Sequence, residues 1–381
     1  MNAPRAYFDW NATAPLGEAA RDAMVAALAA TGNASSVHAE GRAARAVIEK
    51  ARSQVAALVG AEPKNVTFTS GGTEANALAL TPSLETRAGR EPRDKLFVSA
   101  VEHPSVRSGG RFGGVAELPV DGDGRVRLES LAQQLSIAQR PLVSVMLANN
   151  ETGVIQPIAE IAAVVHAANG VLHVDAVQGP GRIECNMDTL GADLMTISAH
   201  KIGGPQGVGA LIRRGDLHIA EPLIRGGGQE RNTRAGTENV AAIAGFGAAA
   251  AALKNDGSRL AKIRDEMEAE LRKITPDIVV FGAHAARLPN TSLFALPGAK
   301  AETAIIAFDL NGVAVSSGSA CSSGKVQPSH VLAAMGVPPD LAIGAIRLSI
   351  GAKTTDNDVG MLLSAWRNIA PGLSKGRGIA A

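Results

Sequence analysis

The sequence predicts an α/β protein in which a large, mostly parallel sheet is followed by a smaller α+β unit. From about residue 16 to residue 250, apolar runs of strand length alternate with helical segments. The runs lack a clean alternation of apolar and polar residues, which is typical of parallel strands covered by helices on both faces. With 381 residues, the chain is also longer than a single hydrophobic core usually supports, so two domains are expected.

The elements of the first part follow one another in a regular order. The predicted strands are 66–69, 96–99, 142–148, 171–174, 194–197 and 208–212. The helical segments between them include 39–58, 74–80 and 158–168. The longest apolar run, 240–253, is well short of the roughly 20 residues that a membrane span needs, and it predicts a buried helix.

The pattern changes after Ala252. A long charged helix at 258–274 leads into short strands at 278–281 and 292–295 and a helix near 302–309. A Gly/Ser-rich loop, a closing strand and a helix follow, and the tail 371–381 is predicted to be loose. In the first part, Asp121-Gly-Asp123-Gly lacks the later ligands of a calcium loop and predicts a turn between 118–120 and 126–128.

Composition argues against several classes of partner and location. The net charge of +1 provides no basis for a nucleic-acid or anionic-membrane surface. The first residues show no basic stretch followed by an apolar core, so no signal peptide is expected. Cys185 and Cys321 are the two cysteines, too few for a disulfide framework or a metal cluster. A cytoplasmic, reducing location is the simplest expectation.

Two predicted strands end on residues with reactive side chains. Asp175 follows 171–174, and Ser198-Ala199-His200-Lys201 follows 194–197. Strand ends face the crevice in which α/β sheets bind ligands. A lysine there can form a Schiff base with an aldehyde cofactor, and a carboxylate can pair with a protonated pyridine nitrogen. Each residue alone could be a loop lysine or a capping aspartate. One strand–helix–strand step apart, they indicate pyridoxal phosphate (PLP).

Further motifs support the same site. Ser70-Gly71-Gly72-Thr73-Glu74-Ala75-Asn76 lies between a predicted strand and helix, where free N–H groups could bind a phosphate, although an ordinary capped turn would look the same. His103, in Glu102-His103-Pro104-Ser105, could stack on a pyridine ring and move protons. It could equally be a helix-entry residue before proline.

Cys321 stands in a segment, 316–324, that otherwise contains only Ser, Gly and Ala. Such a composition cannot build a core and predicts a mobile loop. A cysteine in such a loop is accessible, and we interpret Cys321 as a nucleophile. Cys185, in Arg182-Ile183-Glu184-Cys185, has no such setting and is predicted to be structural.

A series of blocks covers nearly the whole chain. They are YFDWNATAP (7–15), GNASSVH (32–38), TSGGTEAN (69–76), EHPSV (102–106), ANNETG (148–153), HVDAVQ (173–178), SAHK (198–201), GGGQERNTRAGTEN (226–239), SSGSACSSG (316–324) and IRLS (346–349). In content and order they resemble the cysteine desulfurases, a family of class V aminotransferase-like PLP enzymes. The loop with SGSAC, followed by PSHVL (328–332), resembles the NifS/IscS-like group.

The resemblance implies a fold and an assembly. The fold is that of the aspartate aminotransferase-like PLP-dependent transferases, with a mostly parallel seven-stranded sheet. Residues 16–252 would form the large PLP-binding domain, and 1–15 with 253–381 the small α+β domain that carries the cysteine loop. The protein would be a homodimer.

The resemblance also implies a role for each matching residue. Lys201 forms the Schiff base, Asp175 pairs with the pyridinium nitrogen, and His103 stacks on the ring. The remaining roles are distributed as follows: Asn150 and Gln178 face the PLP hydroxyl; Gly72, Thr73, Ser198 and His200 hold the phosphate, with Thr237 reaching in from the second subunit; and Arg347, helped by Asn11 and Asn150, binds the substrate carboxylate. An arginine fork matches a carboxylate bidentately.

The implied reaction removes sulfur from L-cysteine to give L-alanine and a persulfide on Cys321, with Lys201, His103 and Cys321 as catalytic residues. The sulfur would pass to iron–sulfur cluster assembly or to another acceptor. A selenocysteine lyase or a PLP-dependent aminotransferase would share the PLP residues, and an inactive scaffold would share the fold. Trp10 and Ala14 depart from the family pattern, and Trp10 is expected to alter the mouth of the site or the substrate preference. The tail after Pro371 does not resemble the IscS tail that docks a scaffold protein.

Overall fold

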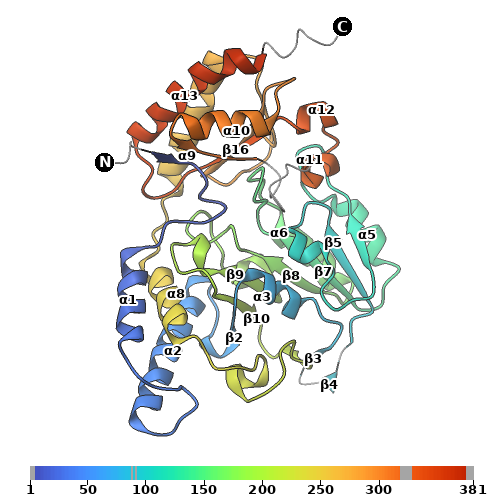
Figure 1. Ribbon diagram of the computed structural model, residues 1–381. Helices are drawn as coiled ribbons and strands as arrows, with labels where there is room; N and C mark the ends of the chain where they lie inside the picture. Colours follow the sequence, from blue (N-terminus) through green and yellow to red (C-terminus); the bar gives the residue numbers. More distant parts are fainter. Residues whose placement is uncertain (1–4, 87–88, 91, 318–327, 375–381) are drawn as a thin grey trace.

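The computed structural model describes residues 5–86, 89–90, 92–317 and 328–374. It confirms the predicted α/β class. A sheet flanked by helices forms the lower part of the molecule in Figure 1, and a smaller sheet with helices α9, α10 and α13 forms the upper part. Strand β1 (Ala6–Tyr7) lies in the upper part, where it pairs with β14 (Val313–Ala314).

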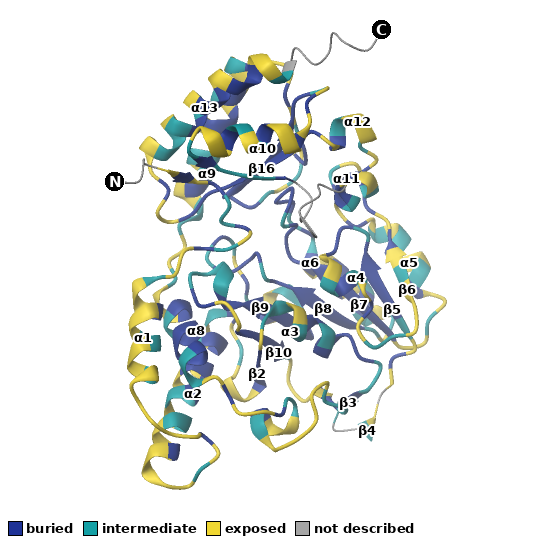
Figure 2. Cartoon of the chain, in the orientation of Figure 1, coloured by how far each residue is buried: buried dark blue, intermediate teal, exposed yellow. Residues whose placement is uncertain are grey.

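The large sheet has seven strands in the order β2-β10-β9-β8-β7-β5-β6. Only β10 runs antiparallel to its neighbours. All residues of β7, β8 and β9 are buried, as the central strands in Figure 2 show, which explains why their sequences do not alternate. The strands are β2 (Val66–Thr69), β5 (Lys95–Ser99), β6 (Val115–Leu118), β7 (Pro141–Met146), β8 (Val171–Asp175), β9 (Leu194–Ser198) and β10 (Gly209–Arg213).

The edge of this sheet differs from the prediction. Strand β6 was not among the predicted strands, because at the sheet edge it is largely exposed and includes a charged residue, Glu117. The turn predicted between 118–120 and 126–128 is confirmed, since the backbone N–H of Gly124 donates to the oxygen of Asp121 and Val126 bridges to Val120. Leu128 then begins helix α5, which buries Leu131 and Leu135.

Helices cover the large sheet. The predicted helix 39–58 is confirmed as α2. The apolar run at 240–253 is confirmed as the buried helix α8, and it packs on both α1 and α2. Its small residues allow this close packing, because a Cβ atom on Gly247 would lie 2.5 Å from the Cα of Ala51. The helices are α1 (Glu18–Leu28), α2 (Ala39–Leu58), α3 (Gly72–Ala79), α4 (Pro104–Arg107), α5 (Leu128–Leu135), α6 (Ile158–Ala167), α7 (Met187–Leu190) and α8 (Val240–Ala252).

The upper part has its own hydrophobic cluster, in which Trp366 packs on the rings of Phe294 and Phe308. Its sheet has the order β12-β13-β16-β15, and β1 pairs with β14 beside it. The strands are β1 (Ala6–Tyr7), β12 (Val279–Val280), β13 (Thr291–Ala295), β14 (Val313–Ala314), β15 (Ser316–Ser317) and β16 (Ala345–Ser349). The helices are α9 (Gly257–Ile274), α10 (Ala301–Leu310), α11 (His330–Ala334), α12 (Pro339–Ala342) and α13 (Asp356–Ser374). A separate small sheet joins β3 (Leu84–Thr86), β4 (Gly89–Arg90) and β11 (His218–Ile219).

The C-terminal segment was predicted to be loose from residue 371 onward. Helix α13 instead continues through Pro371 to Ser374, and Leu373 packs against the cluster around Trp366. Residues 375–381 lie outside the described residues. None of the described helices combines the length and the apolar character that crossing a membrane requires.

Candidate active site

The carboxyl ends of β8 and β9 bring the predicted site residues together. Asp175 is the last residue of β8, and Ser198 is the last of the neighbouring strand β9. A cavity of about 390 Å³ lies at these ends. The predicted residues that line it are Asn11, Gly72, Thr73, His103, Asn150, Asp175, Gln178, Ser198, His200, Lys201 and Arg347.

Asp175 is a buried carboxylate held by hydrogen bonds. Its Oδ2 accepts from Asn76 Nδ2 at 2.8 Å, and its Oδ1 accepts from the backbone N–H of Val177 at 3.1 Å. It forms no ion pair with any cation of the described residues. Burial of a charge is costly unless a charge of opposite sign lies nearby. The carboxylate therefore suits a ligand that brings its own positive charge, as a protonated pyridine ring does.

A chain of hydrogen bonds leads from this carboxylate to His103. Asn76 also donates to Ser105 Oγ at 2.9 Å, and the backbone N–H of Ser105 donates to His103 Nδ1 at 3.2 Å. Burial lowers the pKa of His103, the charge of Asp175 raises it, and that of Lys201 lowers it further. Sequence reasoning assigned no role to Asn76 or Ser105. For Asn76, four residues after Gly72 on α3, helical spacing was a usable signal.

Lys201 has an amine that is easily deprotonated. Its Nζ donates to the backbone oxygens of Asn11 at 2.5 Å and Ala12 at 2.9 Å. Burial and the charges of Arg182 and Arg347 lower its pKa to about 7, against the opposing charges of Asp9 and Asp175. A large fraction of this amine is therefore uncharged near neutral pH.

The part of the cavity at the start of α3 suits a phosphate group. Gly72 and Thr73 begin helix α3, whose first backbone N–H groups favour an anion. A Cβ atom on Gly72 would lie 3.1 Å from Val177 Cγ2, so glycine keeps this corner open. His200 Nδ1 lies 2.7 Å from Thr13 Oγ1, and burial lowers its pKa to about 4. A hollow of about 270 Å³ continues from here over residues 70–74 and Gly207.

Arg347 enters the cavity from β16 of the small sheet. One arm of its guanidinium donates to the backbone oxygen of Asn150 at 3.0 Å, and the other pairs with Asp9 Oδ1 at 2.7 Å. Its Nε is buried and has no hydrogen-bond partner in the described residues. Asp9 was not predicted as a site residue, because its approach to Arg347 depends on the pairing of distant segments.

Asn11 connects the two sheets beneath the cavity. Its Nδ2 donates to the backbone oxygen of Asn150 at 3.1 Å and to Thr291 Oγ1 at 2.9 Å, and its Oδ1 accepts from Asn290. Its backbone oxygen accepts from Gln178 Nε2 at 3.0 Å as well as from Lys201. Asn11 thus holds several cavity residues in place at once.

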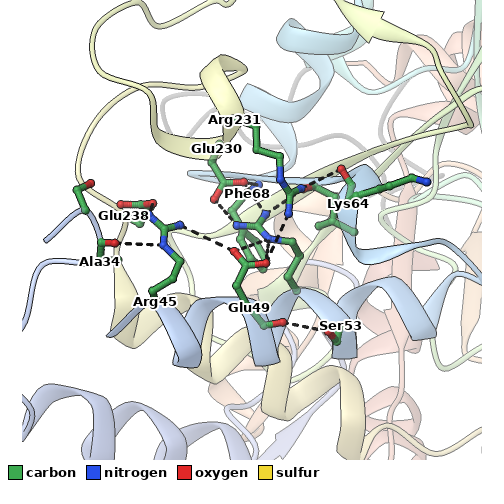
Figure 3. Close-up of polar contacts among 12 residues, drawn as sticks. Ala34, Arg45, Glu49, Ser53, Lys64, Phe68, Glu230, Arg231 and Glu238 are labelled. Carbon is green, nitrogen blue, oxygen red and sulfur yellow. Dashed lines mark hydrogen bonds and ion pairs between the residues drawn. The ribbon is translucent and has the colours of Figure 1, made fainter. Parts of the chain in front are cut away.

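Thr237 is exposed and does not line the cavity of its own chain. It follows a turn in which Glu230, Arg231 and Asn232 all have positive φ angles, which non-glycine residues rarely adopt. Figure 3 shows Glu230 and Arg231 of this turn close to Phe68 and Glu49. The Glu230 carboxylate is buried and paired with Arg52 at 2.7 Å, and Arg231 pairs with Glu49 at 3.5 Å.

The sequence also singled out the two cysteines, Cys321 and Cys185, and Trp10. Cys321 lies outside the described residues, although Ser316 and Ser317 just before it line the cavity. Cys185 is confirmed as a buried residue, and burial raises the pKa of its thiol to about 12. Trp10, which was expected to alter the mouth of the site, does not line this cavity. It lines a second cavity of about 520 Å³, which Lys201 also lines, and its ring packs against Gly351.

Two buried carboxyl groups, Glu102 and Glu151, are sequence neighbours of the cavity residues His103 and Asn150. Glu102 Oε1 accepts from Ser99 Oγ and from the backbone N–H of Met146, both at 2.6 Å, and burial raises its pKa to about 8. Glu151 Oε2 accepts from Ser329 Oγ at 2.5 Å, and burial raises its pKa to about 7. Neither forms part of a metal site, since the described residues contain no cluster of three or more potential metal ligands.

Known proteins resemble this chain over nearly its whole length. The family model "Aminotransferase class-V" matches residues 6–362. A protein named cysteine desulfurase IscS from Dictyoglomus turgidum is 42% identical over 376 residues, which is 95% of this chain and 94% of the relative. A cysteine desulfurase from Gluconacetobacter diazotrophicus is 40% identical over 98% of this chain and 94% of its own.

Solved structures agree. A NifS-like protein from Rickettsia africae superposes with a TM-score of 0.87 at 36% identity, covering 96% of this chain and 99% of its own. A structure described as SspA in complex with cysteine superposes with a TM-score of 0.73 at 28% identity, over 91% of this chain and 98% of its own.

Proposed function

The chain belongs to the class-V aminotransferase family and, within it, to the PLP-dependent cysteine desulfurases, and from this premise we propose which of its residues remove sulfur from L-cysteine. The observation that carries the proposal is that Lys201, Asp175 and Arg347 all line one cavity of about 390 Å³. A lysine, a carboxylate and an arginine there match an aldehyde, a pyridinium and a substrate carboxylate.

PLP would be held by the residues at the strand ends. Lys201 Nζ would bind its aldehyde, the carboxylate of Asp175 would pair with its ring nitrogen, and His103 would contact the ring. Asn150 and Gln178 would contact the hydroxyl. Gly72, Thr73, Ser198 and His200 hold the phosphate, supported by the start of α3 and the open corner at Gly72. When bound, PLP supplies an electron sink for the charge left after proton removal from the substrate Cα.

The substrate carboxylate would bind Arg347, with Asn11 and Asn150 beside it. The buried and unpartnered Nε of Arg347 supports this assignment, because a bidentate carboxylate would satisfy it. Asp9 and the backbone of Asn150 hold the guanidinium in orientation. Lys201 Nζ takes the substrate Cα proton, and its lowered pKa of about 7 suits a group that must accept a proton near neutral pH.

Cys321 would receive the sulfur. Its thiolate attacks the sulfur of cysteine, an S–S bond forms at Cys321 Sγ, the substrate C–S bond breaks with its electrons left on the carbon side, and Cβ gains a proton. Return of the Cα proton from Lys201 Nζ then completes alanine. An ordinary thiol has a pKa of about 8.5, so only a few per cent is ionised at neutral pH. His103 lines the cavity, and its lowered pKa leaves the ring neutral near pH 7, so that it can take the thiol proton.

Three further assignments complete the proposal. The protein acts as a homodimer in which Thr237 reaches the phosphate of the other subunit, which would explain why this exposed residue does not line its own cavity. A sulfur-acceptor or iron–sulfur scaffold protein takes the persulfide sulfur, and a cytoplasmic location would keep the thiols reduced. Residues 16–252 form the PLP-binding domain, and 1–15 with 253–381 form the small domain.

The test measures alanine and sulfide released from L-cysteine in the presence of a thiol reductant. We expect equal amounts of both from the wild-type protein, and loss of sulfide in Cys321→Ala. Cys185→Ala is the matched control, because Cys185 is buried away from the cavity. It should keep the activity. Absence of both products from PLP-loaded wild type would refute the desulfurase activity, and full sulfide release by Cys321→Ala would refute the role of that cysteine.

A further inference from the structure

Arg182 is a buried arginine outside the set of proposed PLP and substrate ligands. Its side chain is only 8% exposed and lines the second cavity, the one of about 520 Å³ that Lys201 also lines. The described residues provide no acidic partner for it. Its guanidinium donates to the backbone oxygen of Gln178 at 3.1 Å and to the side-chain oxygen of the same residue.

An unpaired guanidinium is costly to bury, since it loses hydration without gaining an opposite charge. Burial and the charge of Arg347 lower the pKa of Arg182 to about 10, which still leaves it fully charged at neutral pH. A residue that served packing alone would not need this charge. The positive charge of Arg182, in a cavity that Lys201 also lines, therefore calls for an electrostatic explanation.

Hydrogen bonds place Arg182 relative to Lys201. A guanidinium has only donors, so the side-chain oxygen of Gln178 must face Arg182 and its Nε2 must face away. That Nε2 donates to the backbone oxygen of Asn11, which also accepts from Lys201 Nζ. Arg182 and Lys201 are thus joined through Gln178 and one shared acceptor.

The contacts of Lys201 Nζ are sufficient to satisfy its amine in the uncharged form. A neutral amine has two N–H bonds, and the oxygens of Asn11 and Ala12 accept two hydrogen bonds from Nζ. The lone pair then stays available for a carbonyl carbon or a proton. The charged and titratable groups around this amine are Arg182, Arg347, Asp9, Asp175, His103 and His200. Arg347 is already engaged by Asp9, whereas none of the described residues offers Arg182 an acidic group.

We propose that Arg182 is a positioning residue whose positive charge, anchored on Gln178, drives the proton off Lys201 Nζ. The proposal rests on the proposed role of Lys201. It concerns the protonation of that amine and not the transfer of sulfur to Cys321. Because two like charges close together disfavour each other, removal of the Arg182 charge should make Lys201 Nζ easier to protonate.

The experiment is a pH titration of the visible absorbance of the PLP-loaded protein, which reports protonation at Lys201 Nζ where it joins PLP. Arg182→Gln removes the charge but can still donate to Gln178, and Arg182→Lys keeps the charge. Arg367→Gln removes an exposed charge on α13 as a control. We expect the midpoint of Arg182→Gln to rise by about one unit or more. The Lys variant and the control should stay within a few tenths of the wild type.

If Arg182→Gln does not retain PLP, the same midpoints follow from the pH dependence of the rate at which the full-length chain takes PLP up again. Identical midpoints in wild type and Arg182→Gln would overturn the proposal. Equal shifts in the Gln and Lys variants would also overturn it, because geometry and not charge would then be responsible. Neither readout uses sulfide production, so failure here is distinct from failure of the desulfurase assignment.

Discussion

His173 lies in the middle of β8, two residues before Asp175, and is completely buried. Its ring nitrogens lie 2.8 Å from Ser144 Oγ and 3.0 Å from Thr196 Oγ1 on the neighbouring strands. Burial lowers its pKa to about 4. The ring therefore acts as a neutral cross-strand link that holds the proposed pyridinium-binding strand in register.

We predict that this histidine makes the protein sensitive to acid. The unfolded chain binds the proton below about pH 6.5, and the folded chain binds it only below about pH 4. Stability is therefore complete above pH 6.5 and falls as the pH drops toward 4, by about 3 kcal/mol from this group. Urea unfolding at pH 7 and pH 5 measures the loss, and His173→Gln should lose less than the wild type.

The exposed residue His284 is the control for this measurement. His284→Gln should show the full acid loss of the wild type, because His284 is exposed and has no part in the hydrogen bonds that link β7, β8 and β9 through His173. An equal pH dependence in His173→Gln and wild type would contradict the prediction.

Individual residues differ in how far the sequence could predict them. Asp175 and Lys201 were predictable, because the ends of adjacent parallel strands meet at one edge of a sheet. Asp9 and Arg182 were not, because their partners are set by tertiary approach: Asp9 meets a residue of β16, and Arg182 becomes significant only when its lack of an acidic partner is visible.

At the scale of elements, the turn before Thr237 combines an unfavourable backbone with strong anchoring. Residues with positive φ cost free energy and persist only where their surroundings hold them. Here the Glu230 carboxylate accepts two arms of Arg52 and the backbone N–H of Phe68. Arg234 further along pairs with Glu74 of α3 at 2.9 Å. The segment is thus tied to the element that begins with Gly72.

Arg52→Met should be strongly destabilising, because it leaves Glu230 buried without its partner. Loss of one member of a buried pair costs about 3–5 kcal/mol. Arg21→Met is the matched control, since the Arg21–Asp22 pair is exposed and such pairs contribute at most about 1 kcal/mol. Thermal unfolding of both variants provides the comparison. Similar small losses in the two would show that the buried pair does not hold the turn.

Elements with a regular pattern of burial were predicted best. The ranges 39–58 and 66–69 coincide with α2 and β2, where a single face or full burial governs the composition. Strand β6 was not predicted, because an exposed edge strand carries both polar and apolar residues. The end of α13 was not predicted, because Pro371 suggests that the helix ends before it. In α13 the packing of Leu373 outweighs that local preference.

At the scale of the whole molecule, the cavity lies between two sheets, with Lys201 contributed from one and Arg347 from the other. The proposed homodimer adds a third source, Thr237 of the other subunit. The site would then combine residues from both parts of one chain and from a second chain, and this arrangement can be tested by mixing subunits.

Hybrid dimers of a Lys201→Ala subunit and a Thr237→Ala subunit should regain sulfide production. Each homodimer has two defective sites, whereas the hybrid has one site with both native residues. Its activity should be roughly half that of the wild type if Thr237 acts across a twofold dimer. Purified hybrids carrying two different affinity tags allow the measurement. A hybrid no more active than the parents would place Thr237 with its own Lys201.

The pairing of β1 with β14 has a consequence for folding during synthesis on the ribosome. Ala6 and Tyr7 must wait for Val313 and Ala314, and Asn11 must wait for Ser349 and Thr291. A ribosome adds about 5–20 residues per second, so the first strand spends roughly 15–60 s without its partner. Phe8, buried in the finished protein, is exposed during that interval. The cavity that Asn11 and Arg347 line can therefore be completed only after Ser349 has been added.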